Sequence, residues 1–169
     1  MIIRQEQSQD YETVYQVVKT AFANSEHSGG NEQELVTALR DSKAFIPQLS
    51  LVAVCDGNIV GHILFTKVTI GTKTELALAP LSVLPSYQRQ GIGQALMAEG
   101  HRIARELGYG YSIVLGHPQY YPKAGYLPAS LYGIKAPFEV PDDSFMAVKL
   151  NPEAKPLDGV IEYDPAFGI

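Results

Sequence analysis

The 169-residue sequence is poor in the features that mark several protein classes. Its single cysteine, Cys55, excludes an internal disulfide, and its four histidines are scattered without the spacing of metal ligands. Apolar stretches such as Ile59–Phe65 are interrupted by Gly61 and His62. They fall far short of the roughly 20 residues that a membrane span needs. We therefore expect no disulfide framework, no metal site and no membrane-spanning helix.

Positive charge is also scarce. Thirteen basic residues stand against 18 acidic ones, which gives a formal net charge of −5. This balance disfavours nucleic acid and anionic membrane surfaces as partners. The first ten residues contain no apolar core of a signal peptide, so we expect a soluble cytoplasmic protein. Because 46% of the residues are apolar, the chain has the composition of one globular domain.

The spacing of apolar residues predicts a mixed α/β chain. On the longest expected helix, Leu107 should face the core and His101 should face solvent. His62 should be a core or edge residue of an apolar strand, with its hydrogen bonds satisfied. The expected strands are Met1–Arg4, Leu49–Cys55, Ile59–Ile70, Glu75–Leu84, Tyr111–Leu115 and Phe145–Leu150, and the expected helices begin near Ser8 or Asp10, at Asn31, at Gly91 and within Pro118–Ala124.

One strand–helix–strand crossover stands out in this order. The strand Glu75–Leu84, the helix Gly91–Leu107 and the strand Tyr111–Leu115 predict a right-handed crossover between parallel strands. A ligand then belongs at the carboxyl ends of those strands. Pro80 cannot donate to a strand ladder and predicts a bulge, an edge or a local opening. We expect one domain over residues 1–151, with residues 152–169 as an extension packed on its surface.

The most informative segment is Leu81–Leu96. It reads as a strand, a proline stop at Pro85, a short polar loop and two glycines that open an amphipathic helix. The first N–H groups of a helix lack partners within it, and glycines let a ligand approach them closely. Such a site suits phosphate or pyrophosphate, and Arg89 adds a positive charge. The segment is neither a P-loop nor the dinucleotide fingerprint, because neither the Gly-Lys-Ser/Thr nor the third glycine is present.

The whole segment resembles a family signature. The stretch Val83-Leu84-Pro85 followed by Gln88-Arg89-Gln90-Gly91-Ile92-Gly93 is similar to the acetyl-CoA motif of the GCN5-related N-acetyltransferase superfamily. Tyr121–Tyr126 resembles its second motif, a tyrosine four residues before a glycine and an aromatic residue. The order of elements matches from about Ile2 to Leu150. Gly116–Pro122 resembles a small bacterial subgroup whose motif reads Gly-His-Pro-x-Tyr-Tyr-Pro.

This resemblance implies a fold and a cosubstrate. The fold is α/β, a mixed twisted sheet with a central splayed pair of parallel strands flanked by helices, and the cosubstrate is acetyl-CoA, with no metal. Many family members carry an asparagine after the fifth strand, where this chain has Gly116-His117-Pro118, so that contact is missing or replaced. The residues that match the cofactor-binding positions are Leu81, Ser82, Val83, Gln88, Arg89, Gln90, Gly91, Ile92, Gly93 and Gln94.

The resemblance also places two catalytic residues. Tyr121 matches the general acid that protonates the departing thiolate, with Tyr120 as the alternative if the register differs by one residue. Glu75 matches a glutamate base on the strand that feeds the cofactor site. His117 is the alternative base, because imidazole titrates near neutral pH. Each has a structural reading as well: ring packing for the tyrosines, a solvated charge for Glu75 and a loop hydrogen bond for His117.

The implied activity is transfer of an acetyl group to a primary amine by direct attack in a ternary complex. A catalytically silent acyl-CoA-binding sensor or scaffold is the alternative. The amine belongs to a small molecule, a peptide or a protein, and no nucleic acid or membrane is an expected partner; a homodimer stays open. Segments expected to line the acceptor pocket are Phe22–Glu34, Lys67–Glu75 and Leu131–Pro141.

Overall fold

A computed structural model of the protein describes residues 1–25 and 28–169. Glu26 and His27, within the predicted acceptor loop Phe22–Glu34, lie outside the described residues. The helices are α1 (Tyr11–Phe22), α2 (Glu32–Arg40) and α3 (Ile92–Glu106). The strands are β1 (Ile2–Gln5), β2 (Ser50–Cys55), β3 (Asn58–Ile70), β4 (Lys73–Val83), β5 (Tyr111–Leu115), β6 (Leu127–Pro128), β7 (Ile134–Lys135), β8 (Phe145–Lys149) and β9 (Gly159–Glu162).

The strands form one mixed sheet in the order β1-β2-β3-β4-β5-β8-β6, and β9 pairs with both β3 and β7. Strands β1 to β4 are antiparallel neighbours. Strand β5 is parallel to β4, because α3 carries the chain back across the sheet between them. The predicted crossover and the predicted α/β fold are therefore confirmed.

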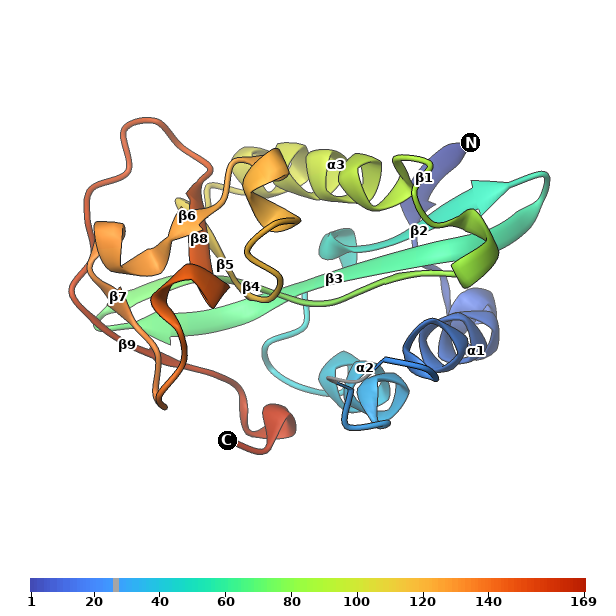
Figure 1. Cartoon of the computed structure of the whole chain (residues 1–169), viewed down its shortest axis with the longest axis horizontal. Coiled ribbons are helices and arrows are strands. Elements are labelled where there is room, and N and C mark those ends of the chain that lie inside the picture. Colours follow the sequence, from blue (N-terminus) through green and yellow to red (C-terminus); the bar gives the residue numbers. More distant parts are fainter. Residues whose placement is uncertain (26–27) are drawn as a thin grey trace.

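Helices cover both faces of this sheet, with α3 on one face and α1 and α2 on the other (Figure 1). Alternate residues of a strand point to opposite faces, so the central strands supply apolar side chains to both layers. On β3, Ile63 and Phe65 pack in the cluster that contains Leu96 of α3. Leu64, between them, packs in the cluster with Val14 of α1 and with α2. Of the described helices, none is both long enough and apolar enough to cross a membrane.

Strands β4 and β5 pair over a short stretch only. Their parallel register consists of Leu76 opposite Ser112 and Ala77 opposite Ile113. Just beyond, the β3–β4 register shifts, because Phe65 faces Leu78 whereas Ile63 faces Leu81. This irregularity places one additional residue of β4 around Ala79-Pro80, which are joined by a cis peptide bond. Of the three features that Pro80 predicted, the bulge is thus confirmed, and the pairing of β4 with β5 ends just before it, at Ala77.

The C-terminal segment contributes a strand to the sheet. In β9, Ile161 lies opposite Ile70 of β3, and Glu162 lies opposite Thr69. The same strand pairs with β7 in parallel, with Ile134 opposite Gly159. Ile161 is buried. The boundary between residues 151 and 152 stays a prediction, but residues 159–162 contact the sheet directly.

The far end of α3 differs from the sequence expectation. His101 is buried, with 5% of its surface exposed, whereas Leu107 is 43% exposed. The expected inward and outward faces were therefore wrong at these two positions. His101 accepts or donates a 3.0 Å hydrogen bond at the Tyr126 hydroxyl, which also bonds Ser112 Oγ at 2.8 Å. Burial, with a smaller contribution from nearby Arg105, lowers the pKa of His101 to about 4.

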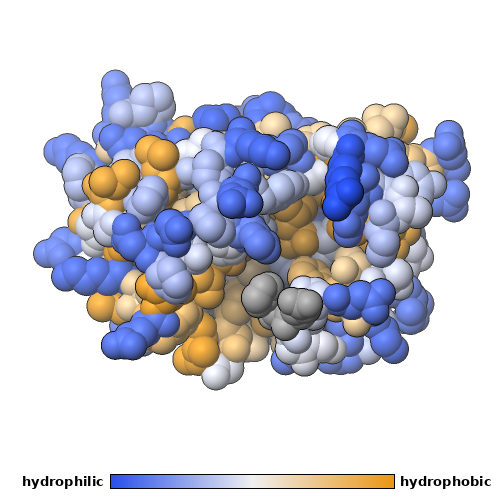
Figure 2. All heavy atoms as spheres, in the orientation of Figure 1, coloured by the Kyte–Doolittle hydropathy of each residue, from blue (hydrophilic) through white to orange (hydrophobic). Residues whose placement is uncertain are grey.

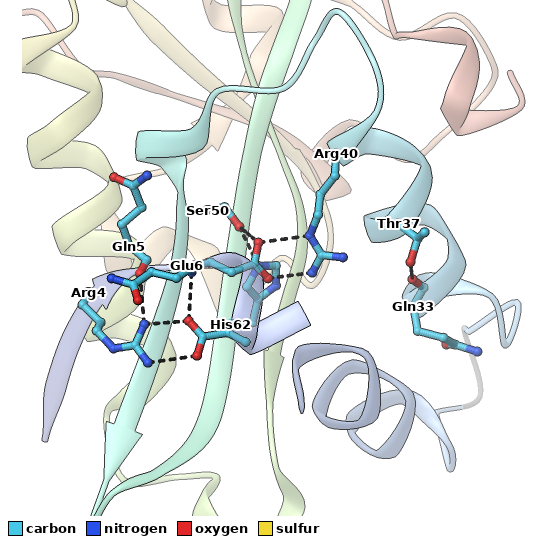
Figure 3. Close-up of polar contacts among 10 residues, drawn as sticks. Arg4, Gln5, Glu6, Gln33, Thr37, Arg40, Ser50 and His62 are labelled. Carbon is cyan, nitrogen blue, oxygen red and sulfur yellow. Dashed lines mark hydrogen bonds and ion pairs between the residues drawn. The ribbon is translucent and has the colours of Figure 1, made fainter. Parts of the chain in front are cut away.

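A buried polar network ties α2 to the sheet on the other face (Figure 3). Arg40 donates to both carboxylate oxygens of Glu6, at 3.1 and 2.6 Å. Ser50 Oγ donates its one hydrogen to the same carboxylate at 2.9 Å. It also lies 3.0 Å from His62 Nε2 and can only accept there, so Nε2 carries a proton and donates to Ser50. Burial lowers the pKa of His62 to about 4, against the opposing charge of Glu6. His62 is a core residue, which is one of the two expected positions, and its Nδ1 has no hydrogen-bond partner among the described residues.

These two buried histidines make stability depend on pH. Both pKa values lie at about 4 in the folded protein and near 6.5 when unfolded, so the unfolded chain binds more protons as the pH falls from 6.5 towards 4. Each histidine should lower the free energy of unfolding by up to about 1.4 kcal/mol per pH unit in that window. Urea unfolding of wild type and His101→Gln at pH 7, 6 and 5 measures this. We expect a shallower slope for His101→Gln, and an unchanged slope would contradict the assignment.

Candidate active site

A cavity of about 860 Å³ opens where β4 and β5 separate. Its wall combines the end of β4, the loop that follows, the start of α3 and the segment 117–123. This is the carboxyl end of the parallel pair, where the crossover predicted a ligand. Of the predicted cofactor-binding residues, the cavity brings together Leu81, Val83, Gln88, Arg89, Gly91, Ile92, Gly93 and Gln94.

The end of β4 presents backbone groups to this cavity. Leu84 N–H donates to the Val60 carbonyl of β3 at 2.9 Å. Backbone groups of successive residues point to opposite sides of a strand, so those of Leu81 and Val83 face away from β3. The β4–β5 register ends at Ala77, and β5 therefore offers no ladder partner to these two residues. Their N–H groups are available to an extended ligand that takes the place of a neighbouring strand.

The loop between β4 and α3 is held by side-chain amides. Gln88 Nε2 donates to the Val83 carbonyl at 3.0 Å, and Gln90 Nε2 lies 3.3 Å from the Ser86 carbonyl. Arg89 adopts a left-handed backbone, with φ of 63°, and its side chain is exposed at the cavity. The loop thus brings one full positive charge to the mouth of the cavity.

Glycine is required at the two motif positions for different structural reasons. Gly91 is the N-cap of α3 and has φ of +83°, a conformation that side chains rarely adopt. At Gly93 a Cβ would collide with the Tyr120 hydroxyl. Gln94 Nε2 is buried beside the Tyr120 hydroxyl. The free N–H groups of the helix start and the Arg89 side chain together fit a pyrophosphate.

Two predicted cofactor residues lie outside the lining of this cavity. Ser82 sits opposite His62 of β3, and its Oγ is buried without a partner in the described part of the chain. Its backbone faces β3, because it alternates with Leu81. Gln90 is exposed and bonds the loop instead. The motif alone does not tell which of its residues line the cavity, because that depends on the direction in which each residue points.

The two adjacent tyrosines lie side by side in the wall. The rings of Tyr120 and Tyr121 are 5.1 Å apart at an angle of 89°. Burial raises the pKa of Tyr121 well above its ordinary value, and Tyr120 adds to that rise. Burial also raises the pKa of Tyr120, against the effect of the neighbouring Gln94 amide. Both phenols therefore hold their protons at neutral pH.

The structure does not bring Glu75 to this cavity. It lies near the start of β4, six residues before Leu81 and about 20 Å away along the strand. Its Oε1 accepts hydrogen bonds from the N–H groups of Gly110 (2.9 Å) and Tyr111 (3.2 Å). Burial raises the pKa of Glu75, and these two N–H groups oppose the rise. In this position Glu75 joins the start of β4 to the start of β5.

A second cavity, of about 490 Å³, meets the first. The two share Leu81, His117, Tyr120 and Tyr121, so these four residues mark where they join. From the predicted acceptor segment Phe22–Glu34, the described residues in its wall are Phe22, Ser25, Ser28 and Glu32. The segments Lys67–Glu75 and Leu131–Pro141 line neither of these two cavities.

Lys123 is a site residue that sequence reasoning missed. It lines the first cavity together with Arg89 and brings a second cation to it. The signal was present, because Lys123 lies inside the Tyr121–Tyr126 motif two residues after the proposed acid. Over residues 1–25 and 28–169, no group of three or more His, Cys, Asp or Glu side chains is arranged to hold a metal ion.

The mixed α/β fold is that of the GNAT acetyltransferases. The sequence profile described as "Acetyltransferase (GNAT) family" matches residues 11–125. Among curated relatives, the uncharacterized N-acetyltransferase YjhQ of Escherichia coli is 39% identical over 117 residues, which span 66% of this chain and 65% of YjhQ. The uncharacterized N-acetyltransferase YhbS of the same species is 30% identical over 140 residues, 80% of this chain and 83% of YhbS.

Solved structures agree with these relatives. The crystal structure of the GNAT family N-acetyltransferase YhbS from Escherichia coli in complex with CoA superposes with a TM-score of 0.89, at 26% identity over 99% of this chain and 92% of that one. A GNAT family acetyltransferase from Brucella melitensis in complex with acetyl-CoA gives 0.81, at 34% identity over 98% and 97%. The chain therefore belongs to the acetyltransferase (GNAT) family. The narrower likeness to a Gly-His-Pro-x-Tyr-Tyr-Pro subgroup stays a prediction.

The contact between Gly93 and Tyr120 can be tested by substitution. Gly93→Ala places a Cβ against the Tyr120 hydroxyl, and the resulting overpacking should cost about 1–3 kcal/mol of stability. Tyr120→Phe removes that hydroxyl, so the double variant should regain much of the loss. Thermal and urea unfolding of both single variants and the double variant measure the coupling. Strictly additive effects would show that the two residues do not touch.

Proposed function

We propose that this protein is an acetyl-CoA-dependent N-acetyltransferase that acts on a primary amine by direct transfer in a ternary complex. One observation carries the proposal. The N–H groups of Leu81 and Val83, which lack a ladder partner, and the glycine start of α3 face the same cavity, which joins a second cavity at Tyr121. The cavity thus offers the N–H groups of β4 to the extended arm and the reacting carbonyl of an acyl-CoA. It offers the start of α3 to the diphosphate of the same ligand. The CoA and acetyl-CoA complexes of the two structural relatives support this reading.

The chain's own residues divide the binding between them. The N–H groups of Leu81 and Val83 would hold the pantetheine arm and polarise the thioester carbonyl. The N–H groups at Gly91 to Gly93 would bind the pyrophosphate, with Arg89 and Lys123 adding positive charge. When bound, acetyl-CoA supplies the acetyl thioester. Losing one N–H donor at a developing oxyanion typically costs about 2.7–4 kcal/mol.

Proton transfer needs an acceptor and a donor near the junction of the two cavities. An alkyl amine with a pKa of about 10.4 must lose a proton before it attacks. His117 lines both cavities, so we assign the role of base to it in preference to Glu75, which lines neither. Tyr121 also lines both, and burial keeps its phenol protonated. It is the proposed donor to the departing thiolate.

The activity itself is tested with acetyl-CoA, an amine panel and detection of free thiol. Acetyl-CoA alone should raise the melting temperature, because a ligand that binds only the folded state stabilises it. Amine-dependent thiol release should then follow. A melting temperature unchanged by saturating acetyl-CoA would refute the cofactor site. A clear shift without thiol release for any amine would leave binding without the proposed chemistry.

Tyr121→Phe should separate chemistry from binding. The ring stays in the wall and only the proton donor is removed, so the acetyl-CoA shift in melting temperature should persist. Single-turnover transfer should fall by about 10²-fold or more, the low end for a general acid. Tyr120→Phe is the matched control, since it removes a hydroxyl from the neighbouring ring. A larger loss in Tyr120→Phe would place the acid one residue earlier.

The base is tested by comparing His117→Ala with Glu75→Gln. His117→Ala should lower turnover by roughly 10²–10⁴-fold and change the pH–rate profile near neutrality. Glu75→Gln keeps one oxygen that can accept from Gly110 or Tyr111, so it should affect stability more than rate. Steady-state rates from pH 6 to 9 and unfolding curves distinguish the two. A profile altered only in Glu75→Gln would return the role to that residue.

A further inference from the structure

The walls of the second cavity come from three different parts of the chain. One wall comes from the α1–α2 side and includes Phe22, Glu32 and Leu35; β4 supplies Leu78 and Pro80. The residues that follow β5, among them His117 and Tyr121, close the other side, where the cofactor cavity begins. In Figure 2 the surface is hollowed near its lower centre, and the side chains visible in the hollow are mostly apolar. A volume of about 490 Å³ is in the range of small-molecule sites.

The described residues of this cavity carry their charge in one place. Among the described residues that line it, Glu32 is the one with a full charge at neutral pH, and His117 is the one other titratable group besides the two tyrosines. Ser28 Oγ donates to Glu32 Oε1 at 2.6 Å, which fixes the carboxylate. Glu32 does not line the cofactor cavity. A fixed negative charge therefore lies in the wall away from the place where acetyl transfer would occur.

This separation restricts the acceptor. An amine whose single nitrogen pairs with Glu32 would stay protonated and be held away from His117 and Tyr121. An acceptor with two nitrogens avoids the conflict, because one ammonium pairs with Glu32 while the other nitrogen reaches the junction. Between them the wall offers Phe22, Leu35 and other apolar side chains, which suit a methylene chain.

We propose that the acceptor is a small aliphatic α,ω-diamine and that Glu32 recognises its distal ammonium. The proposal rests on the proposed acetyltransferase function and adds the class of substrate. Attack by the proximal nitrogen forms the C–N bond and releases the CoA thiol, and the proton of that nitrogen passes to His117. The distal ammonium keeps its charge throughout. Glu32 is thus a specificity-determining residue and takes no part in the chemistry.

The test compares 1,6-diaminohexane with n-hexylamine, which differ only by the second nitrogen. Wild type should use the diamine with a kcat/KM about 10- to 100-fold higher, the effect of a hydrogen bond to a charged group. Glu32→Gln keeps the shape and the contact to Ser28 but removes the charge. It should remove the preference for the diamine over the monoamine, mainly by raising KM for the diamine.

Glu34→Gln is the matched control, because Glu34 is exposed on the same helix, bonds Tyr15 and does not line the cavity. It should leave both amines unaffected. Equal use of the two amines by wild type, or an unchanged diamine preference in Glu32→Gln, would overturn the proposal while leaving the acetyltransferase function intact. If no amine releases thiol, the proposed function fails. A diamine-dependent rise in the melting temperature of the CoA-bound protein, lost in Glu32→Gln, would still support the distal ammonium site, and no rise would refute it.

Discussion

The early end of the β4–β5 ladder governs the rest of the site. After Ala77 and Ile113 the two parallel strands no longer pair, and the backbone of Leu81 and Val83 is left facing a cavity. Unpaired N–H groups in a protein interior are costly, so such a gap persists only where a ligand or water can reach it. The surrounding elements keep the gap open. Strand β3 holds the other edge of β4, and Glu75 joins the starts of β4 and β5.

The site is divided between two cavities because tyrosine side chains stand at their junction. Tyr120 lies against Gly93, whereas Tyr121 packs against Gly116, where a Cβ would collide with its ring. Small residues thus stand at the two places where these rings need room. This arrangement accounts for the glycine directly after β5. The packing of Tyr121 occupies the space that a longer side chain at Gly116 would need.

Much of the fold followed from the sequence because local signals agreed with one another. The spacing of apolar residues predicted the main strands and helices, and Pro80 indicated the irregularity in β4. The errors arose where tertiary contacts decide. The position of His101 depends on Tyr126, which is 25 residues away in the sequence, and helical periodicity contains no information about that hydrogen bond. The same applies to Glu75, whose partners Gly110 and Tyr111 come from another strand. The sequence did place Phe22–Glu34 near a pocket, but which of these side chains line the second cavity depends on the packing of α1 and α2.

The ion pair between Glu6 and Arg40 has a consequence for how related sequences diverge. A buried charge that loses its partner destabilises a protein by about 3–5 kcal/mol, whereas replacing both partners by apolar residues is often close to neutral. Single changes at either position should therefore be rare among relatives, and joint changes should be tolerated. Positions 6 and 40 would then covary although they are far apart in the chain. Such covariation would indicate that the segment after β1 and helix α2, which also carries Glu32, evolve together.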